Sequence, residues 1–161
     1  MKPLRVRKPR PLREAADRGI AFDELPSYVG YQVRRAQAKI FGEFADALGA
    51  MDFTPGSFGV LTLIRANPGI TQVALAAAFG VDKSTLSPVI VRLEKRGLVR
   101  RRVLERDRRC QALYLEASAE TVFLAARERV RAFEASVAAR LSKGEQRELA
   151  RLLAKLEGEA P

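Results

Sequence analysis

The sequence predicts a mainly α-helical chain with one small β-hairpin, and three observations support this fold class. Most of the chain repeats its apolar residues at intervals of three and four, the spacing of a helix with one buried face. Between Thr71 and Leu115 the pattern changes from helix to short turn, then to a second helix and two β-compatible runs around an arginine-rich tip. Long helical patterns precede and follow this segment. The order is typical of a winged helix-turn-helix flanked by N- and C-terminal dimerisation helices.

The first two predicted helices precede this segment. The apolar residues between Pro26 and Leu48 step by three and four until Gly49, which predicts one long amphipathic helix. Thr54-Pro55 then has the arrangement of a helix N-cap followed by proline at the first helical position. The helix that it opens is expected to end before the turn-forming residues 67–69.

Caps and glycines bound the two helices of the helix-turn-helix. Thr71 is a suitable N-cap for a short helix that ends at Gly80, because glycine adopts the left-handed conformation of a helix C-terminus without strain. Asp82 or Ser84 can cap the second helix, which continues until Gly97.

Two β-compatible runs follow the second helix. Residues 98–103 and 110–115 favour strands, and the second run alternates apolar residues at its end. Residues 104–109 between them are too polar to lie in a core. We therefore expect a β-hairpin wing whose solvent-facing tip is formed by residues 104–109.

A long helix and a shorter one are predicted after the wing. The first extends from Ser118 to Leu141. Ser142 and Glu145 then have the spacing of a capping box, which opens the last helix. The apolar stripe of this last helix consists of Leu149, Leu152, Leu153 and Leu156.

These outer helices carry more apolar surface than a compact winged domain needs, which predicts a homodimer. Two-fold symmetry would place two recognition helices about 34–36 Å apart, as a palindromic DNA site requires. A helical bundle within one chain is the alternative. We expect a basic arm at 1–19, an N-terminal dimerisation helix at 20–50, a DNA-binding domain at 51–116 and C-terminal dimerisation helices at 117–161.

The net charge of +10 is concentrated in two segments. Residues 92–109 hold nine cations and three anions, a net charge of +6, and residues 1–18 hold +5, so the rest sums to −1. Cationic side chains gain affinity for DNA by releasing counterions from its phosphates, so double-stranded DNA is the expected partner. A solvated charged face is the alternative for the first segment. The arm is equally compatible with reaching along DNA and with a solvated tail.

Composition also excludes several classes of site. The chain has no histidine and a single cysteine, Cys110, so we expect no metal, no cofactor and no enzyme. Cys110 is either a small hairpin residue or, beside several arginines, a redox-sensitive thiol. No apolar run reaches the ~18–20 residues of a membrane span, and no signal peptide is apparent, which predicts a cytoplasmic protein.

The order of these elements resembles the MarR family of bacterial transcriptional regulators. The resemblance covers residues 25–157, and its most specific parts are GVDKSTLSPVIVRLEKRGLVRR (residues 80–101) and ERDRR (residues 105–109). It implies that the start of the recognition helix enters the major groove, that a later arginine clamps a phosphate, and that wing arginines enter the minor groove beside an orienting aspartate. The major-groove residues implied are Lys83, Ser84, Thr85 and Ser87, and the phosphate clamp is Arg92. The wing arginines are Arg106, Arg108 and Arg109, and the orienting aspartate is Asp107. Asp107 is alternatively a turn residue that closes the hairpin.

Many MarR-family members are repressors that release DNA when a small aromatic or anionic ligand binds between the dimerisation helices and the winged domain. The resemblance places Tyr28, Tyr31, Arg34 and Phe58 in the wall of such a site. The sequence around them is similar to regulators of hydroxycinnamate-type aromatic catabolism, which implies a phenolic acid or its coenzyme A thioester. Alternatively, these are ordinary core or dimer-interface residues.

The sequence thus predicts a homodimeric repressor that binds a palindromic operator and is released by a small ligand. A non-sensing architectural DNA-binding protein of the nucleoid type is the alternative. An enzyme would need a cluster of carboxylates or lysines in a pocket, whereas the acidic residues here are mostly dispersed over helix surfaces.

Overall fold

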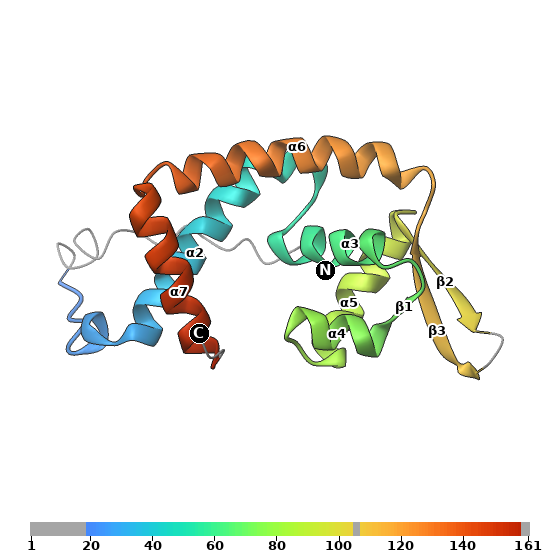
Figure 1. Cartoon of the computed structure of the whole chain (residues 1–161), viewed down its shortest axis with the longest axis horizontal. Coiled ribbons are helices and arrows are strands. Elements are labelled where there is room, and N and C mark those ends of the chain that lie inside the picture. Colours follow the sequence, from blue (N-terminus) through green and yellow to red (C-terminus); the bar gives the residue numbers. More distant parts are fainter. Residues whose placement is uncertain (1–18, 105–106, 159–161) are drawn as a thin grey trace.

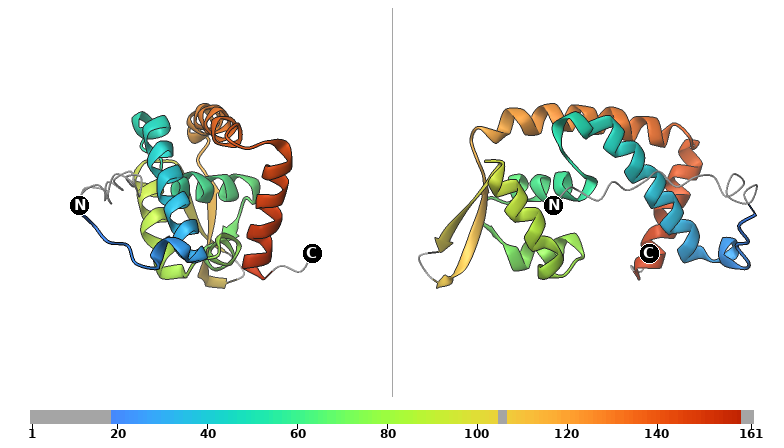
Figure 2. Two further views of the ribbon diagram at one scale, coloured as in Figure 1. Left: turned by 90° about the vertical axis from the view of Figure 1, so that its left-hand side faces the viewer. Right: turned by 180° about the vertical axis from the view of Figure 1, so that it is seen from behind.

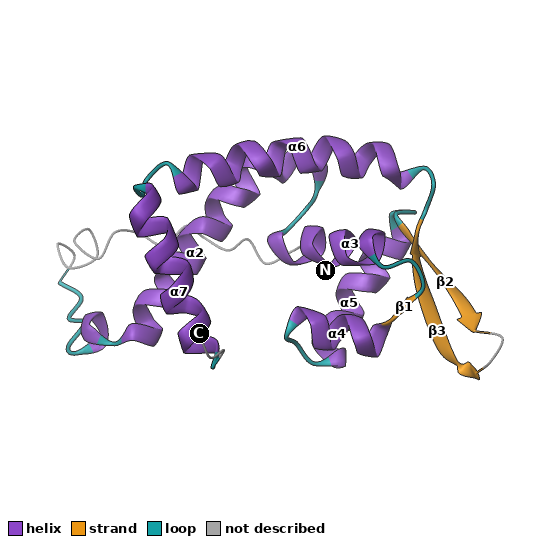
Figure 3. Ribbon diagram, in the orientation of Figure 1, coloured by secondary structure: helices purple, strands orange, loops and turns teal. Residues whose placement is uncertain are grey.

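The computed structural model describes residues 19–104 and 107–158, in which a winged domain lies under one half of a helical arch (Figures 1 and 3). The elements in chain order are η1 (Leu25–Ser27), α2 (Val29–Leu48), η2 (Gly49–Met51), α3 (Pro55–Ala66), β1 (Ile70–Thr71), α4 (Gln72–Phe79), α5 (Lys83–Lys95), β2 (Val99–Leu104), β3 (Asp107–Leu115), α6 (Ala119–Ala138) and α7 (Lys143–Glu157). α6 extends from the end of β3 to the turn before α7, and α2 packs against it (Figure 2). α3, α4, α5 and the sheet lie on the other side of the molecule from α7.

The predicted caps begin the helices of the winged domain. Thr54 accepts a hydrogen bond from the Ser57 N–H at 3.1 Å, and the Ser57 hydroxyl accepts one from the Thr54 N–H at 2.8 Å, so α3 starts with a capping box. Thr71 caps α4 by accepting a hydrogen bond from the N–H of Ala74 at 3.2 Å. Gly80 ends α4 with a φ of 67°. Across this turn α4 and α5 are bent by 112°, within the range of a helix-turn-helix.

The recognition helix α5 begins at Lys83. Of the two expected caps, Asp82 occupies the N-cap position, and it makes no side-chain cap hydrogen bond. The helix continues through Pro88 and ends at Lys95, shortly before Gly97 with its φ of 66°. Its buried face consists of Leu86, Ile90 and Leu93.

The sheet has three strands, one more than the sequence predicts. The additional strand β1 pairs antiparallel with β3, with Ile70 opposite Leu113, and β3 also pairs with β2, which gives the order β1-β3-β2. The prediction of a tip at residues 104–109 is wrong, because Leu104 and residues 107–109 lie in the strands and only 105–106 separate them. Backbone pairing in a hairpin can continue through polar residues to a two-residue connection. A register shift between Val103 and Leu104 marks an irregularity near the end of β2.

Two predicted helix boundaries also move. Residues 25–27 form a 3-10 turn, so α2 begins at Val29 rather than at Pro26. Gly49 follows α2 in right-handed conformation, and Asp52, three residues later, adopts the left-handed conformation with a φ of 53°. The bend between α2 and α3 across this segment is 66°. At the other end of the chain, α6 stops at Ala138 and not at Leu141.

One hydrophobic core joins the winged domain to the first half of α6. Phe123 of α6 stacks on Phe58 of α3 with ring centroids 5.6 Å apart, and Phe58 packs edge-on against Phe53 at 6.2 Å. Beside this stack the Arg65 guanidinium donates to the Glu120 carboxylate, with an Nη2–Oε1 distance of 2.6 Å. That hydrogen bond lowers the pKa of Glu120. The start of α6 is therefore fixed to α3.

The second half of α6 is fixed to α2. Phe44 and Phe133 pack edge to face with ring centroids 5.5 Å apart. Next to them the Glu43 carboxylate accepts a hydrogen bond from Arg140 Nη2 at 2.6 Å and lies 2.9 Å from Lys39 Nζ. The hydrogen bond from Arg140, with a second from Lys39, lowers the pKa of Glu43 to about 2.

The C-terminal helix α7 begins as predicted, with the capping box of Ser142 and Glu145. None of its described residues is buried, and Leu149, Leu152, Leu153 and Leu156 are 38–62% exposed. The apolar stripe predicted for this helix is therefore present but uncovered in a single chain.

No single helix in the described residues is long and apolar enough to cross a membrane. Two bent pairs, α2 with α3 and α4 with α5, reach the required length and composition only when their members are taken together.

Glu43→Gln should destabilise the fold at neutral pH and have a smaller effect in acid. Because the folded pKa of Glu43, about 2, lies below its ordinary value of 4.5, the ionised carboxylate contributes fully to the free energy of unfolding above about pH 4.5. This contribution is lost as the pH falls from 4.5 toward 2. Urea-unfolding midpoints of both proteins across this range measure the effect. The gap between the midpoints should close in acid, and a constant gap would contradict a role of the carboxylate charge.

Candidate nucleic-acid interface

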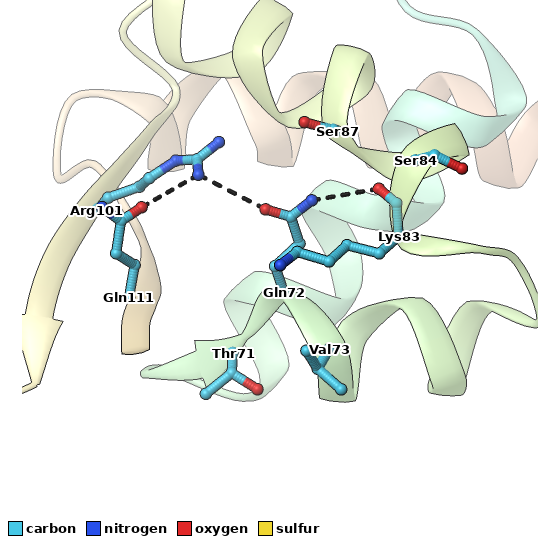
Figure 4. A pocket seen from close by; sticks show the side chains of 8 residues that line it. All are labelled: Thr71, Gln72, Val73, Lys83, Ser84, Ser87, Arg101 and Gln111. Atoms are coloured by element: carbon cyan, nitrogen blue, oxygen red, sulfur yellow. Dashed lines mark hydrogen bonds between the residues drawn. The ribbon is translucent and has the colours of Figure 1, made fainter. Parts of the chain in front are cut away.

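A hollow of about 810 Å³, lined mostly by residues with polar side chains, lies between the starts of α4 and α5 and the two long strands (Figure 4). The lining residues are Thr71, Gln72 and Val73 around the start of α4, Lys83, Ser84 and Ser87 of α5, Arg101 of β2 and Gln111 of β3. Two of them are cationic, three carry hydroxyls and two carry amides, and no acidic residue is among them. The free charge of Lys83, together with the hydroxyl and amide groups, favours an anionic partner with many hydrogen-bond acceptors.

Hydrogen bonds join the walls of this hollow to one another. Arg101 Nη1 donates to Gln111 Oε1 at 3.1 Å and to Gln72 Oε1 at 3.5 Å, and Gln72 Nε2 donates to the carbonyl of Lys83 at 3.3 Å. In Figure 4 these bonds form a chain across the hollow. On its other side Arg101 Nε donates to Glu94 Oε1 at 2.8 Å. The helix-turn-helix and the wing are thus connected through side chains.

The start of α5 is the most accessible part of that helix. Lys83, Ser84 and Thr85 are exposed and Ser87 is half-buried. Three of these four residues, Lys83, Ser84 and Ser87, line the same hollow and can therefore contact one ligand together. Thr85 is not among the lining residues. Lys83 has no ion-pair partner within the described part of the chain, so its charge is available to a ligand.

Arg92, predicted to clamp a phosphate, is paired within the chain. Its Nη2 lies 2.5 Å from the Asp52 Oδ1, in the segment between α2 and α3. Arg96, one turn later, donates to the backbone carbonyls of Asp52 at 2.6 Å and Met51 at 2.8 Å, and its guanidinium lies over the Phe53 ring. The second half of the recognition helix is thereby attached to this segment. The charge of Arg92 is partly offset by Asp52 before any DNA arrives.

Two more arginines of the cationic segment 92–109 are paired in the same way. Arg100 Nη1 lies 2.9 Å from Glu116 Oε2, and Arg101 is bonded to Glu94. Within this segment, carboxylates therefore neutralise several of the guanidinium groups that the charge count assigns to DNA. Arg102 on the neighbouring position of β2 is exposed, with its guanidinium 5.6 Å from the centre of the Tyr114 ring.

The predicted wing contacts are only partly described. The backbone of Asp107, Arg108 and Arg109 forms the first three positions of β3, so Asp107 is a strand residue. The side chains of these three residues, and Arg106 as a whole, lie outside the described residues. The side chain of Cys110 lies outside them as well.

The four residues predicted for a ligand wall do not come together in one chain. Tyr28, Tyr31 and Arg34 lie at the start of α2, at the end of the molecule away from the winged domain, whereas Phe58 packs in the core of that domain (Figure 1). Tyr28 donates to the Glu24 carboxylate at 2.7 Å, a bond that raises the pKa of the tyrosine. Tyr31 has the Arg35 guanidinium 5.7 Å from its ring centre.

Candidate metal ligands do not cluster in the residues that the structure describes, where no group of three or more acidic or cysteine side chains is placed to hold an ion.

Five residues of the hollow were not predicted as site residues: Thr71, Gln72, Val73, Arg101 and Gln111. Gln72 follows the predicted N-cap Thr71, which is a local signal for the edge of the helix-turn-helix. Arg101 and Gln111 meet only because β2 and β3 pair, and nothing local distinguishes Arg101 from the arginines on either side of it.

The chain is similar in sequence and in fold to several transcriptional regulators. Residues 53–111 match the MarR family model. A protein of Thauera aromatica, named as a transcriptional regulatory protein for the hcr operon, is 34% identical over 138 residues, 85% of this chain and 83% of that protein.

Two solved structures superimpose over nearly their whole length. The transcriptional repressor CouR bound to a 23-mer DNA duplex has a TM-score of 0.78 and 29% identity, with 86% of this chain and 98% of CouR covered. The PcaV transcriptional regulator from Streptomyces coelicolor, in complex with its natural ligand, has a TM-score of 0.75 and 25% identity, with 88% and 100% covered.

Proposed function

The chain belongs to the MarR family of transcriptional regulators, and we propose that it acts as a homodimeric repressor that binds a palindromic operator and is released by a small aromatic or anionic ligand. The observation that carries this proposal is the hollow at the start of α5. It presents Lys83, Ser84 and Ser87 on an accessible helix end, next to a β-hairpin held at a fixed position.

Duplex DNA fits the chemistry and the shape of this face. A helix N-terminus enters the major groove, where serine hydroxyls can bond base edges or phosphates and a lysine can bind phosphate. The hairpin beside it would then lie over the adjacent minor groove, and the first helix of the motif would cross the backbone. The similarity to CouR, which was solved on a DNA duplex, supports this placement.

The uncovered helices support a dimer. α7 has four exposed leucines on one stripe, and Val29 and Val33 near the start of α2 are 61% and 43% exposed. Exposed apolar side chains in such an arrangement are typical of interfaces, because a monomer gains nothing from holding them in water. A second copy of the chain, packed against α2 and α7, would bury them and set the distance between two recognition helices.

A ligand site formed only in the dimer would explain the separation of the predicted wall residues. Tyr31 and Arg34 offer an aromatic ring and a cation at the start of α2, which suits a phenolic acid or its coenzyme A thioester. The similarity to PcaV, solved with its natural ligand, supports a ligand-responsive regulator. Phe58 would contribute only to the apolar inner side of such a site, because its ring already stacks on Phe123.

The DNA-binding role predicts that the protein protects a palindrome in the DNA upstream of its own gene. Binding should occur at concentrations on the order of nanomolar and weaken steeply with added salt, since cations of α5 and the wing displace counterions. DNase footprinting locates the site, and fluorescence anisotropy with a random duplex of equal length is the control. Equally tight binding of both duplexes would contradict a repressor and favour the nucleoid-type alternative.

The dimer role predicts that Leu152→Asp yields a monomer. The leucine is 43% exposed in the single chain, so the substitution should leave the monomer fold intact while placing two charges in the two-fold interface. Arg147→Asp, on the opposite side of α7 by helical spacing, is the matched control and should remain dimeric. Sedimentation velocity measures both. A monomeric wild-type protein, or a dimeric Leu152→Asp variant, would refute this interface.

The ligand role predicts a higher melting temperature in the presence of aromatic acids or their coenzyme A thioesters, because a ligand that binds only the folded state stabilises it. A hydroxycinnamoyl thioester at about a hundred times its Kd should raise the melting temperature by several degrees. Arg34→Ala should abolish this shift, whereas Arg129→Ala, which removes an exposed arginine of α6, should preserve it. Absence of any shift in a broad panel would favour the non-sensing alternative.

A further inference from the structure

We propose that Arg101 is a positioning residue, which fixes the wing relative to the recognition helix and acts without binding DNA itself. The inference rests on the DNA-binding role proposed above. Arg101 is one of the cations of residues 92–109 that the net charge alone would assign to phosphate contacts.

The contacts of Arg101 reach α4, α5 and β3, the three elements that surround the hollow together with β1 and with β2, on which Arg101 lies. From β2 its guanidinium bonds Glu94 on α5, Gln111 on β3 and Gln72 at the start of α4, at 2.8, 3.1 and 3.5 Å. Only one of these partners, Gln111, is a neighbour in the sheet; the other two belong to the helix-turn-helix. A single planar group with several fixed donors therefore connects the hairpin to both helices, in addition to the core packing of Val99 and Leu113.

The same group is connected to both ends of the recognition helix. Glu94, which Arg101 bonds directly, is the penultimate residue of α5. Gln72, which accepts a hydrogen bond from Arg101, donates one to the carbonyl of Lys83, the first residue of α5. These two residues lie about 16 Å apart along the helix axis at 1.5 Å per residue. A rotation or a slide of α5 relative to the wing would break at least one of these bonds. The spacing between the two groove-reading elements is thus held by Arg101.

The charge of Arg101 is already committed. Its side chain and that of Glu94 are each only 26% exposed, and their ion pair uses the Nε donor while Nη1 serves the two amides. A phosphate would have to compete with a carboxylate at 2.8 Å. Arg102, the next residue, is exposed and rests on an aromatic ring, so it is the matched comparison for a loss of charge on the same strand.

The decisive test compares affinity, salt dependence and specificity in the full-length protein. Arg101→Met and Glu94→Gln should each weaken binding to the operator by about three- to tenfold, the effect of one partly exposed charged hydrogen bond. Neither should change the slope of log K against log salt, or the affinity for a random duplex, because no phosphate contact is lost. Lys83→Ala is the reference for a phosphate contact and should reduce the slope by about 0.9.

Three further variants separate geometry from charge. Arg101→Lys keeps the charge but cannot bond three acceptors in one plane, so it should behave like Arg101→Met. The double variant of Arg101→Met with Glu94→Gln should bind the operator no more weakly than Arg101→Met alone, because both substitutions remove the same ion pair. Arg102→Met should leave the ratio of operator to random affinity unchanged.

Hydrogen exchange in the absence of DNA tests independently whether Arg101 holds the hairpin against the helices. The backbone amides of β2 and β3 should exchange faster in Arg101→Met than in the wild type, while those of α6 should not change. Unchanged exchange, Glu94→Gln binding at least as tightly as the wild type, or a slope that falls by about 0.9 in Arg101→Met would each overturn the proposal. If the wild type does not prefer its operator, the proposed function fails, and the exchange result alone decides on Arg101.

Discussion

The burial of one face of α5 is the interaction on which the winged domain depends. Leu86, Ile90 and Leu93 are at most 1% exposed, and truncating such a side chain to alanine typically costs about 2–5 kcal/mol. Once this face is fixed in the core, the position of Lys83 and Ser87 on the outside follows from helix geometry alone. The ion pairs of Arg92 with Asp52 and of Glu94 with Arg101 then connect α5 to the segment before α3 and to β2. They restrict rotation of the helix relative to these neighbours.

The elements set by short-range signals could be predicted from the sequence. Thr54, Thr71 and Ser142 cap their helices as expected, and Gly80 and Gly97 adopt the left-handed conformation that ends a helix. Elements that depend on distant partners could not. β1 has two residues and exists because Ile70 and Thr71 meet β3 more than forty positions later, so no local pattern indicates it.

The candidate site divides in the same way. The accessible residues at the start of α5 follow from the helix boundary, which caps and glycines define. The partners of the arginines do not: Asp52 precedes Arg92 by forty positions, and Glu116 follows Arg100 by sixteen. A count of charges along the sequence assigns all of these cations to DNA, whereas the fold assigns several of them to its own carboxylates. The pairing of Arg92 with Asp52 also connects the recognition helix to the segment that follows α2.

The exposure of α7 has a consequence for how related regulators coexist. None of its described side chains is buried in the chain's own core, so in the proposed dimer the partner's surface would constrain its leucine stripe more than the chain's own core does. If that dimer forms, substitutions along the leucine stripe would alter the choice of partner while leaving the residues at the start of α5 unchanged. A cell with many chains of this fold could keep them from forming mixed dimers by diversifying this one helix, while the helix-turn-helix and the wing evolve separately toward different operators.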